Sequence, residues 1–180
     1  MNENKLDRRV KYTKKMLKNA LVQLMKQQHI STVSVKALCE LADINRSTFY
    51  AHYNDQYDLL HQVEQEVMDN VRCYLKKVMT ESFDIKAPVI VLTCIFEYAK
   101  ENSELFQVLL SENSDHVFQK DVIELSQIVS TRSSDTLDER VKEYITEFRT
   151  AGCISISQKW LKDGTIESPE EMSDLIGRLM

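Results

Sequence analysis

Residues 34–60, SVKALCELADINRSTFYAHYNDQYDLL, carry the most information about the fold of this chain. Ser34 is a suitable N-cap, because its hydroxyl can accept a hydrogen bond from the N–H groups that open a helix. Apolar or small residues then follow at i, i+3, i+4 and i+7, the spacing of one helix face. These residues are Val35, Leu38, Cys39 and Ala42. The pattern predicts a helix of two turns from Val35 to Ala42.

A polar turn at Asp43-Ile44-Asn45 ends this helix. Asp and Asn tolerate left-handed backbone and bond to turn backbone, and Asn45 can also cap the next helix. That second helix, Arg46 to about Ala51, is too short to be stable alone. We therefore expect Phe49 to anchor it inward and Asp55 to cap a third, long helix.

Two short helices joined by a tight turn, followed by a long one, match the layout of a helix-turn-helix reader of duplex DNA. In that motif the second helix lies in the major groove, with its N-terminal residues nearest the base edges. Arg, Ser and Thr can bond to base edges, whereas Tyr50 and His52 suit phosphate contacts. The open alternative is a plain three-helix packing unit that contacts no DNA. The predicted DNA-binding residues are Lys11, Ser34, Asn45, Arg46, Ser47, Thr48, Tyr50 and His52.

The same residues resemble the DNA-binding domain of the tetracycline-repressor (TetR) family. The resemblance covers about the first 60 residues and has two departures. Asp43 stands where the family commonly has Gly, and Gln56 stands where it usually has a Lys that meets a phosphate. The matching positions are Thr13, Ala20, Leu24, Ser34-Val35, Leu38, Ala42, Asn45, Ser47-Thr48-Phe49-Tyr50, His52-Tyr53 and Leu59-Leu60.

Composition favours an all-α fold. The 180 residues are 43% hydrophobic, enough for one or two small domains with a core. They include only three Gly and two Pro, and no hairpin dipeptide joins two alternating apolar runs. We expect a three-helix helix-turn-helix domain over residues 1–60 and a helical ligand-binding and dimerisation domain over residues 61–180.

Charge is distributed unevenly along the chain. The net charge of −5 alone would argue against nucleic acid. Residues 1–60, however, hold ten Lys/Arg against six Asp/Glu, whereas residues 61–180 hold thirteen against twenty-two. A basic head on an acidic body concentrates the attraction for phosphate at one end. The alternative interpretation of the basic residues near the N-terminus is a solvated helix face or a localisation tag.

The sequence also predicts a cytoplasmic protein. Its N-terminus is polar and charged, so no signal peptide is apparent. The longest apolar stretch, Val89 to Phe96, is far short of the ~20 residues that cross a bilayer. Four Cys are widely spaced without a CxxC or Cys/His ligand pattern, and we expect them to be buried small apolar residues. A redox-sensing thiol is the alternative.

Further helices are predicted along the rest of the chain. In the last of them, Ser168, Pro169 and Glu171 form a capping-box pattern. Gly164 is the expected C-terminal cap of the helix before it. The first helix is predicted over 7–28, and the third runs without a break from 55 to about 82. The next helix opens at Pro88, and further helices are predicted over 103–110, 117–129 and 139–162. A connector is predicted over 131–138, and a last helix follows Ser168.

The final two helices are the expected dimerisation surface, since the resembled family usually dimerises there. Ala151 and Gly152 allow close approach and Trp160 offers large burial; ordinary intrachain core is the alternative. The tail from Phe148 to Met172 also resembles the C-terminal domain of a TetR subgroup that includes dihydroxyacetone-kinase-linked activators.

No catalytic motif, metal-ligand spacing or cofactor motif stands out, so we do not expect an enzyme. His29 is expected at the end of the first helix. The leading hypothesis is a homodimeric, ligand-responsive repressor that binds a palindromic operator in double-stranded DNA. The alternative is a co-activator or protein-interaction module that works with a metabolic partner protein. A small-molecule effector pocket is implied by the resemblance only, with candidate lining residues Tyr74, Phe96, Tyr98, Phe106, Tyr144, Phe148 and Trp160.

Overall fold

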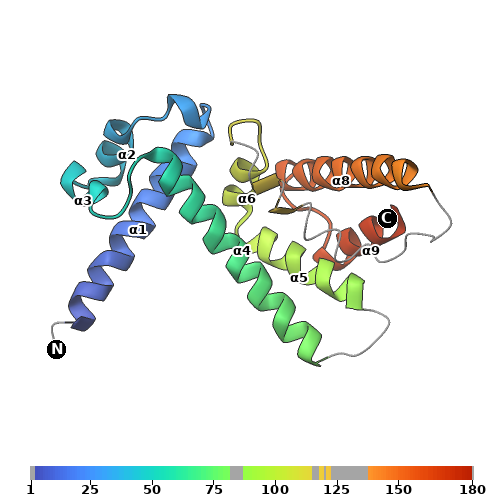
Figure 1. The fold of residues 1–180 in the computed structure, drawn as a ribbon. Coiled ribbons are helices and arrows are strands. Elements are labelled where there is room, and N and C mark those ends of the chain that lie inside the picture. Colours follow the sequence, from blue (N-terminus) through green and yellow to red (C-terminus); the bar gives the residue numbers. More distant parts are fainter. Residues whose placement is uncertain (1–2, 82–86, 115–117, 120, 123–137, 180) are drawn as a thin grey trace. The chain divides into compact units, whose positions relative to one another are not determined.

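A computed structural model describes residues 3–81, 87–114, 118–119, 121–122 and 138–179. Within these ranges the secondary structure is helical, without a strand, which confirms the predicted all-α class (Figure 1). The elements are α1 (Glu3–Met25), the short 3-10 helix η1 (Ile30–Thr32), α2 (Val35–Ala42), α3 (Arg46–Tyr50), α4 (Gln56–Glu81), α5 (Ala87–Glu101), α6 (Ser103–Leu109), α8 (Glu139–Lys162) and α9 (Pro169–Leu179).

The chain forms two compact units. The head unit comprises Met1–Val67 together with Glu112–Asp115, and the body unit comprises Met68–Ser111 together with His116–Met180. Helix α4 is continuous through the point where the head ends and the body begins. The sequence of α4 contains no Gly or Pro, and the helix is unbroken, as its apolar pattern predicts.

The head is built on the apolar stripe of α1 and the short helices that follow it. Leu17 and Leu21 of α1 and Leu38 of α2 are fully buried, and Thr13 is almost fully buried. The predicted range of the first helix, 7–28, was wrong at both ends, because α1 runs from Glu3 to Met25. His29 consequently does not end α1. Its ring Nδ1 instead accepts a hydrogen bond from the Ser31 N–H as the N-cap of η1.

The segment Glu112–Asp115 belongs to the head although it follows α6 in the chain. The Asn113 side-chain amide donates a 2.8 Å hydrogen bond to the Met25 carbonyl at the C-terminus of α1. The Asn113 carbonyl in turn accepts a 3.0 Å hydrogen bond from the Ile30 N–H. One residue therefore holds both the end of α1 and the start of η1, a role that the sequence pattern had not indicated.

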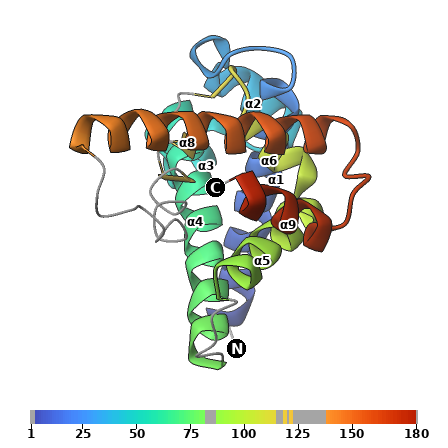
Figure 2. The same ribbon diagram turned by 90° about the vertical axis from the view of Figure 1, so that its right-hand side faces the viewer.

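In the body, α5 packs along α9 and α6 contacts α8 (Figure 2). Trp160 of α8 is 3% exposed, its ring meets Phe96 edge to face at 5.2 Å, and its Nε1 donates to the Glu167 carbonyl. This corrects the expectation that Trp160 offers burial to a dimer partner. Its large apolar surface is already used inside the chain, the alternative left open by the sequence.

Most of the predicted helix ends agree with the structure. Helix α8 has the predicted bounds, and α6 and α4 each end within one residue of the prediction. At α9, the Glu171 side chain accepts from the Ser168 N–H while the Ser168 hydroxyl accepts from the Glu171 N–H, which confirms the capping box. Gly164 follows α8 with a positive φ of 89°, as expected of a C-terminal cap. The predicted helix over 117–129 and connector over 131–138 lie largely outside the described residues.

The cysteines do not share one environment. Cys39 is buried and Cys94 and Cys153 are half-buried, but Cys73 is exposed on α4. The expectation of four buried thiols is therefore wrong for Cys73, which falls on the polar side of a helix that is only partly covered. Burial raises the pKa of the Cys39, Cys94 and Cys153 thiols, which disfavours the reactive thiolate form.

Candidate nucleic-acid interface and body cavity

Helix α3 has five residues, and contacts fix it at both ends. At its start the Asn45 Oδ1 accepts a 2.9 Å hydrogen bond from the Ser47 N–H, which confirms Asn45 as the N-cap. At its other end Phe49 is fully buried and contacts the rings of Tyr50 and Tyr53 at 5.5 Å. Because a five-residue helix has little stability of its own, these contacts fix which side chains face outward.

The outward face of α3 carries polar side chains and one aromatic ring. Arg46 and Ser47 are exposed, and Tyr50 is 60% exposed. Thr48 is half-buried, so less of it is accessible than of its neighbours. The Ser47 hydroxyl donates to the Asn45 Oδ1, which leaves the Asn45 amide N–H groups as its outward donors. The surface thus presents donors that suit base edges and phosphate.

The turn between α2 and α3 adopts the conformation predicted for Asp43. Its backbone is left-handed, with φ 53° and ψ 47°, and the Ile44 N–H bonds back to the Cys39 carbonyl. Gly would adopt this conformation without strain, whereas Asp adopts it at a cost of about 1 kcal/mol. The departure from the family pattern at this position is therefore accommodated locally. Ser34 also caps α2 as predicted, its hydroxyl accepting from the Ala37 N–H.

The start of α4 is fixed by a network around Asp58. One of its carboxylate oxygens accepts from both the backbone and the side-chain amide of Asn54, at 2.8 and 2.9 Å. The other accepts from Gln62, and the Asp58 N–H donates to Asp55, the predicted cap. The backbone N–H of Asn54, followed by the Gln62 amide, lowers the pKa of Asp58, since both bond to its charged form.

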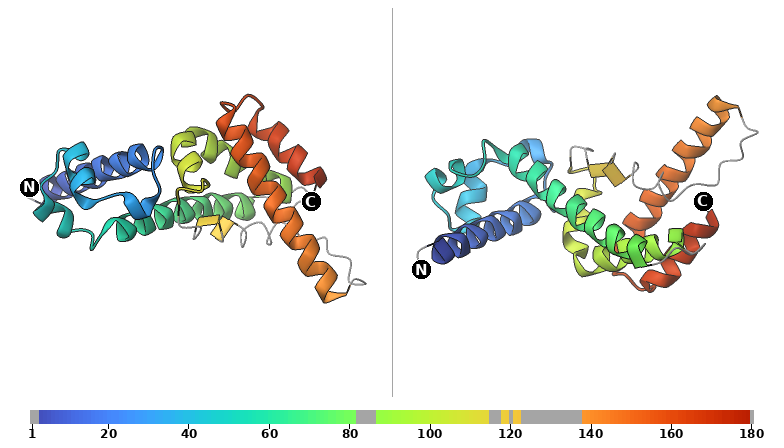
Figure 3. Two further views of the ribbon diagram at one scale, coloured as in Figure 1. Left: turned by 90° about the horizontal axis from the view of Figure 1, so that it is seen from above. Right: turned by 60° about the horizontal axis from the view of Figure 1, so that its bottom comes forward.

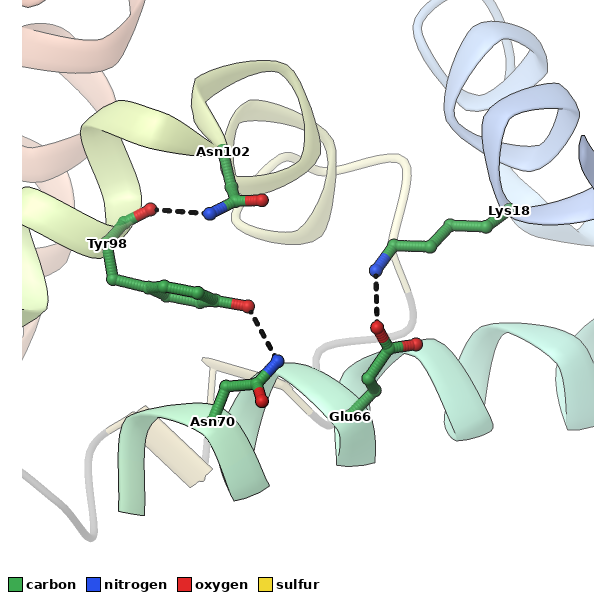
Figure 4. A network of polar contacts seen from close by, with 5 residues as sticks. All are labelled: Lys18, Glu66, Asn70, Tyr98 and Asn102. Carbon is green, nitrogen blue, oxygen red and sulfur yellow. Dashed lines mark hydrogen bonds and ion pairs between the residues drawn. The ribbon is translucent and has the colours of Figure 1, made fainter. Parts of the chain in front are cut away.

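The basic side chains of α1 have different environments. The Lys14 ammonium lies 6.0 Å from the centroid of the Tyr53 ring, and the Lys18 ammonium pairs with Glu66 at 3.1 Å (Figure 4). Lys11, one turn before Lys14, is exposed. Pairing with Glu66 makes Lys18 a structural cation of the head, whereas the position of Lys11 is compatible with a phosphate contact.

His52 and Tyr53 follow the C-terminus of α3. Tyr53 is 5% exposed, and its burial, with smaller effects of Glu66 and Asp58, raises its pKa to about 12. His52 is half-buried, with its ring 6.3 Å from that of Tyr53. Tyr53 is therefore a neutral core residue at physiological pH. The predicted contacts Lys11, Ser34, Asn45, Arg46, Ser47, Thr48, Tyr50 and His52 all lie in the head and are exposed or half-buried.

The body contains an apolar cavity of about 100 Å³. Three of the candidate aromatics, Phe96, Phe106 and Trp160, line it. Two others do not, because Tyr144 and Phe148 are 69% and 79% exposed. The Tyr98 hydroxyl accepts a 2.9 Å hydrogen bond from Asn70, and Asn102 donates to the Tyr98 carbonyl (Figure 4). The side chain of Tyr74 lies outside the described residues.

Sequence reasoning identified Trp160 of α8 as a lining residue but missed the other α8 residues that line this cavity. The cavity-facing residues of α8 recur at i, i+3, i+4, i+7, i+10 and i+11 and include three small polar side chains. The helical spacing was a signal for one common face, although it could not show what that face meets. The residues are Thr150, Cys153, Ile154, Ser157, Trp160 and Leu161.

The described residues contain no group of three or more His, Cys, Asp or Glu side chains that could hold a metal ion. In the same part of the chain, no helix combines the length and apolar character needed to span a membrane.

Comparison with known families gives a match over the second half of the chain. Residues 86–180 match the model of the TetR-type transcriptional regulator C-terminal region. A curated relative is the uncharacterised HTH-type transcriptional regulator YxbF of Bacillus subtilis, 22% identical over 172 residues. The match covers 91% of this chain but 43% of YxbF, so the chain spans less than half the length of that relative.

Solved structures share the fold over almost the whole chain. The fatty acid degradation regulator FadR of Bacillus halodurans aligns with a TM-score of 0.69 at 14% identity, covering 93% of each chain. A TetR transcriptional regulator of Streptococcus agalactiae aligns with a TM-score of 0.63 at 19% identity, covering 94% of each chain. At these identities the likeness shows the fold, whereas the family is shown by the match over residues 86–180.

Proposed function

Because the chain belongs to the TetR family of transcriptional regulators, we propose that its head binds operator DNA with α3 in the major groove. The observation that carries the proposal is the orientation of α3. Its apolar anchor Phe49 is fully buried, so Arg46, Ser47 and Tyr50 face outward together. In this proposal Arg46 and Thr48 read base edges, while Lys11, Ser34, Tyr50 and His52 contact phosphates.

Homodimerisation is the second part of the proposal. Val141, Tyr144 and Phe148 lie at i, i+3 and i+7 of α8 and are 43%, 69% and 79% exposed. Figure 3 shows the N-terminal half of α8 projecting beyond α5 and α9. Further along, among the described residues outside its own helical turns, none places an atom within 4 Å of where a Cβ of Gly152 would stand. An apolar stripe with open space beside it supports contact with a second copy, and two heads would bind a palindrome.

Ligand-responsive repression completes the proposal. The cavity in the body supports a small-molecule effector, and the continuous α4 supports transmission of a ligand-induced change to the head. The division into a DNA-binding domain over residues 1–60 and a ligand-binding and dimerisation domain over 61–180 belongs to this proposal, as does a cytoplasmic location. Membership of the dihydroxyacetone-kinase-linked subgroup stays a prediction.

A co-activator that works with a metabolic partner protein is the second candidate. The exposed stripe of α8 also suits a different protein as partner. Light scattering of the purified chain separates the two, because a homodimer has twice the mass of the chain at micromolar concentration, whereas a co-activator surface leaves it monomeric.

The test of DNA binding is selection of genomic fragments by the purified protein, followed by titration of a retained fragment at several salt concentrations. Affinity should fall steeply with salt, because each neutralised phosphate releases counterions. Thr48→Ala should reduce discrimination between the retained fragment and a scrambled one. Lys11→Ala should weaken both alike and lower the salt slope by about one. A salt slope near zero, or unchanged discrimination by Thr48→Ala, would contradict the assignment of α3.

A further inference from the structure

Among the residues that the structure describes, those that line the body cavity are all uncharged. The walls opposite α8 come from α4, α5 and α6, with Leu92, Phe96 and Ala99 of α5 at the i, i+4 and i+7 positions of one face. The lining also includes Met68, Val71 and Phe106. A charged ligand placed here would lose part of its hydration without gaining a counter-charge from these residues, which disfavours its binding.

The α8 wall adds polar groups to this apolar enclosure. Thr150 and Ser157, two turns apart, both line the cavity, and Thr150 is 7% exposed. Ser157 is half-buried, and each of the two residues brings a hydroxyl that can donate and accept a hydrogen bond. Hydroxyls in a largely apolar site are normally hydrogen-bonded, because an unmet donor or acceptor there is unfavourable. Two such hydroxyls on one wall are suited to an oxygen atom of a bound molecule.

The size of the cavity limits what that molecule can be. At about 100 Å³ it is of the order of the engineered cavity of about 150 Å³ that takes up a single benzene ring. A long acyl chain would not fit in this volume unless the surrounding helices moved apart.

From these observations we infer that the body binds a small, uncharged, ring-sized molecule with a hydrocarbon surface and one neutral oxygen. The oxygen bonds to the Thr150 hydroxyl, with Ser157 within the same wall, and the hydrocarbon part contacts Phe96 and Ala99. This inference names the ligand class of the effector site and rests on the proposed function only for the regulatory meaning of binding.

The experiment uses three probes built on the toluene ring: toluene, p-cresol and p-toluate, titrated calorimetrically into the full chain at pH 7. Toluene has no oxygen, p-cresol has a neutral hydroxyl at the para position, and p-toluate has a charged carboxylate there. p-Cresol should bind about three- to tenfold more tightly than toluene, because one hydrogen bond contributes about this factor to binding. p-Toluate should bind at least about 100-fold more weakly than p-cresol. Tighter binding of p-toluate than of p-cresol would overturn the inference.

Two variants locate the binding. Thr150→Val preserves the shape of the side chain and should remove the preference for p-cresol over toluene while leaving toluene unchanged. The matched control is Thr146→Val, one turn earlier on α8, where the side chain is exposed and does not line the cavity. Ala99→Leu should fill the cavity and weaken toluene and p-cresol alike by more than about tenfold.

The outcomes separate this inference from the proposed function. Binding of p-cresol that survives Ala99→Leu in the folded variant, or a preference that survives Thr150→Val, overturns the assignment to this cavity. If none of the three probes binds while operator DNA does, the ligand class is wrong and the DNA-binding proposal stands. If p-cresol binds as predicted while no DNA fragment is retained, the cavity assignment stands and the proposed function fails.

Discussion

The Asn113 side-chain amide donates a 2.8 Å hydrogen bond to the Met25 carbonyl, the last residue of α1. The free carbonyls at a helix C-terminus need partners, and Asn113 supplies one from a segment 88 residues away in the sequence. The Asn113 carbonyl also accepts from Ile30, so both ends of the α1–η1 connection meet the same residue.

Asn113→Ala should loosen that connection. Loss of the bond leaves the Met25 carbonyl without this partner and should cost about 1–2 kcal/mol of local stability. Amide exchange at Ile30 should accelerate by roughly 5- to 30-fold, since 1.4 kcal/mol corresponds to a factor of ten. Asn19→Ala, an exposed change on α1, is the matched control and should leave this exchange rate within about twofold. Equal rates in wild type and Asn113→Ala would show that the bond does not stabilise the connection.

Phe49→Ala should destabilise the head by about 3–5 kcal/mol, because the ring is fully buried and its removal leaves a cavity. Tyr50→Ala is the neighbouring control on the same helix, 60% exposed, and should cost at most about 1 kcal/mol. Urea titrations followed by circular dichroism at 222 nm measure both. Similar costs for the two changes would mean that Phe49 is not the anchor of α3.

Asp58 gives the start of α4 a predictable pH dependence. Its pKa is lowered in the folded state, first by the Asn54 backbone N–H and then by Gln62, so its charged form is favoured by folding. The stabilisation is fully present above the unfolded pKa, about 3.9, and is lost as pH falls through the lower folded value. Asp58→Asn should therefore be less stable than wild type at pH 7, and the difference should shrink below about pH 4. A difference that stays constant from pH 7 to pH 3 in urea titrations would contradict this assignment.

Phe148→Glu should shift the assembly toward the monomer if the stripe of α8 meets a second copy. A carboxylate placed in an apolar contact would be desolvated without a partner. Ile166→Glu is the matched control, because Ile166 is 78% exposed but lies in the turn between α8 and α9, off the stripe. Sedimentation velocity over a concentration series reports the masses. An unchanged dimer in Phe148→Glu would place the interface elsewhere, and a monomeric wild type would remove the dimer from the proposal.

Local sequence chemistry was sufficient to predict much of the head. The N-caps Ser34 and Asn45, the left-handed turn at Asp43 and the inward Phe49 depend on contacts within a few residues. Such contacts are specified by the side chains themselves. The capping box at Ser168 and Glu171 was predictable for the same reason.

Contacts between segments that are distant in the sequence could not be predicted and depend on the packing of the helices. Spacing placed Trp160 on a helix face, but its burial against Phe96 required knowledge of which helix that face meets. The exposure of Tyr144 and Phe148, the shared cavity wall of Thr150 and Ser157, and the bond from Asn113 to Met25 have the same origin. A helix period specifies which residues share a face, whereas packing across long sequence separations specifies whether that face meets a core, a cavity or solvent.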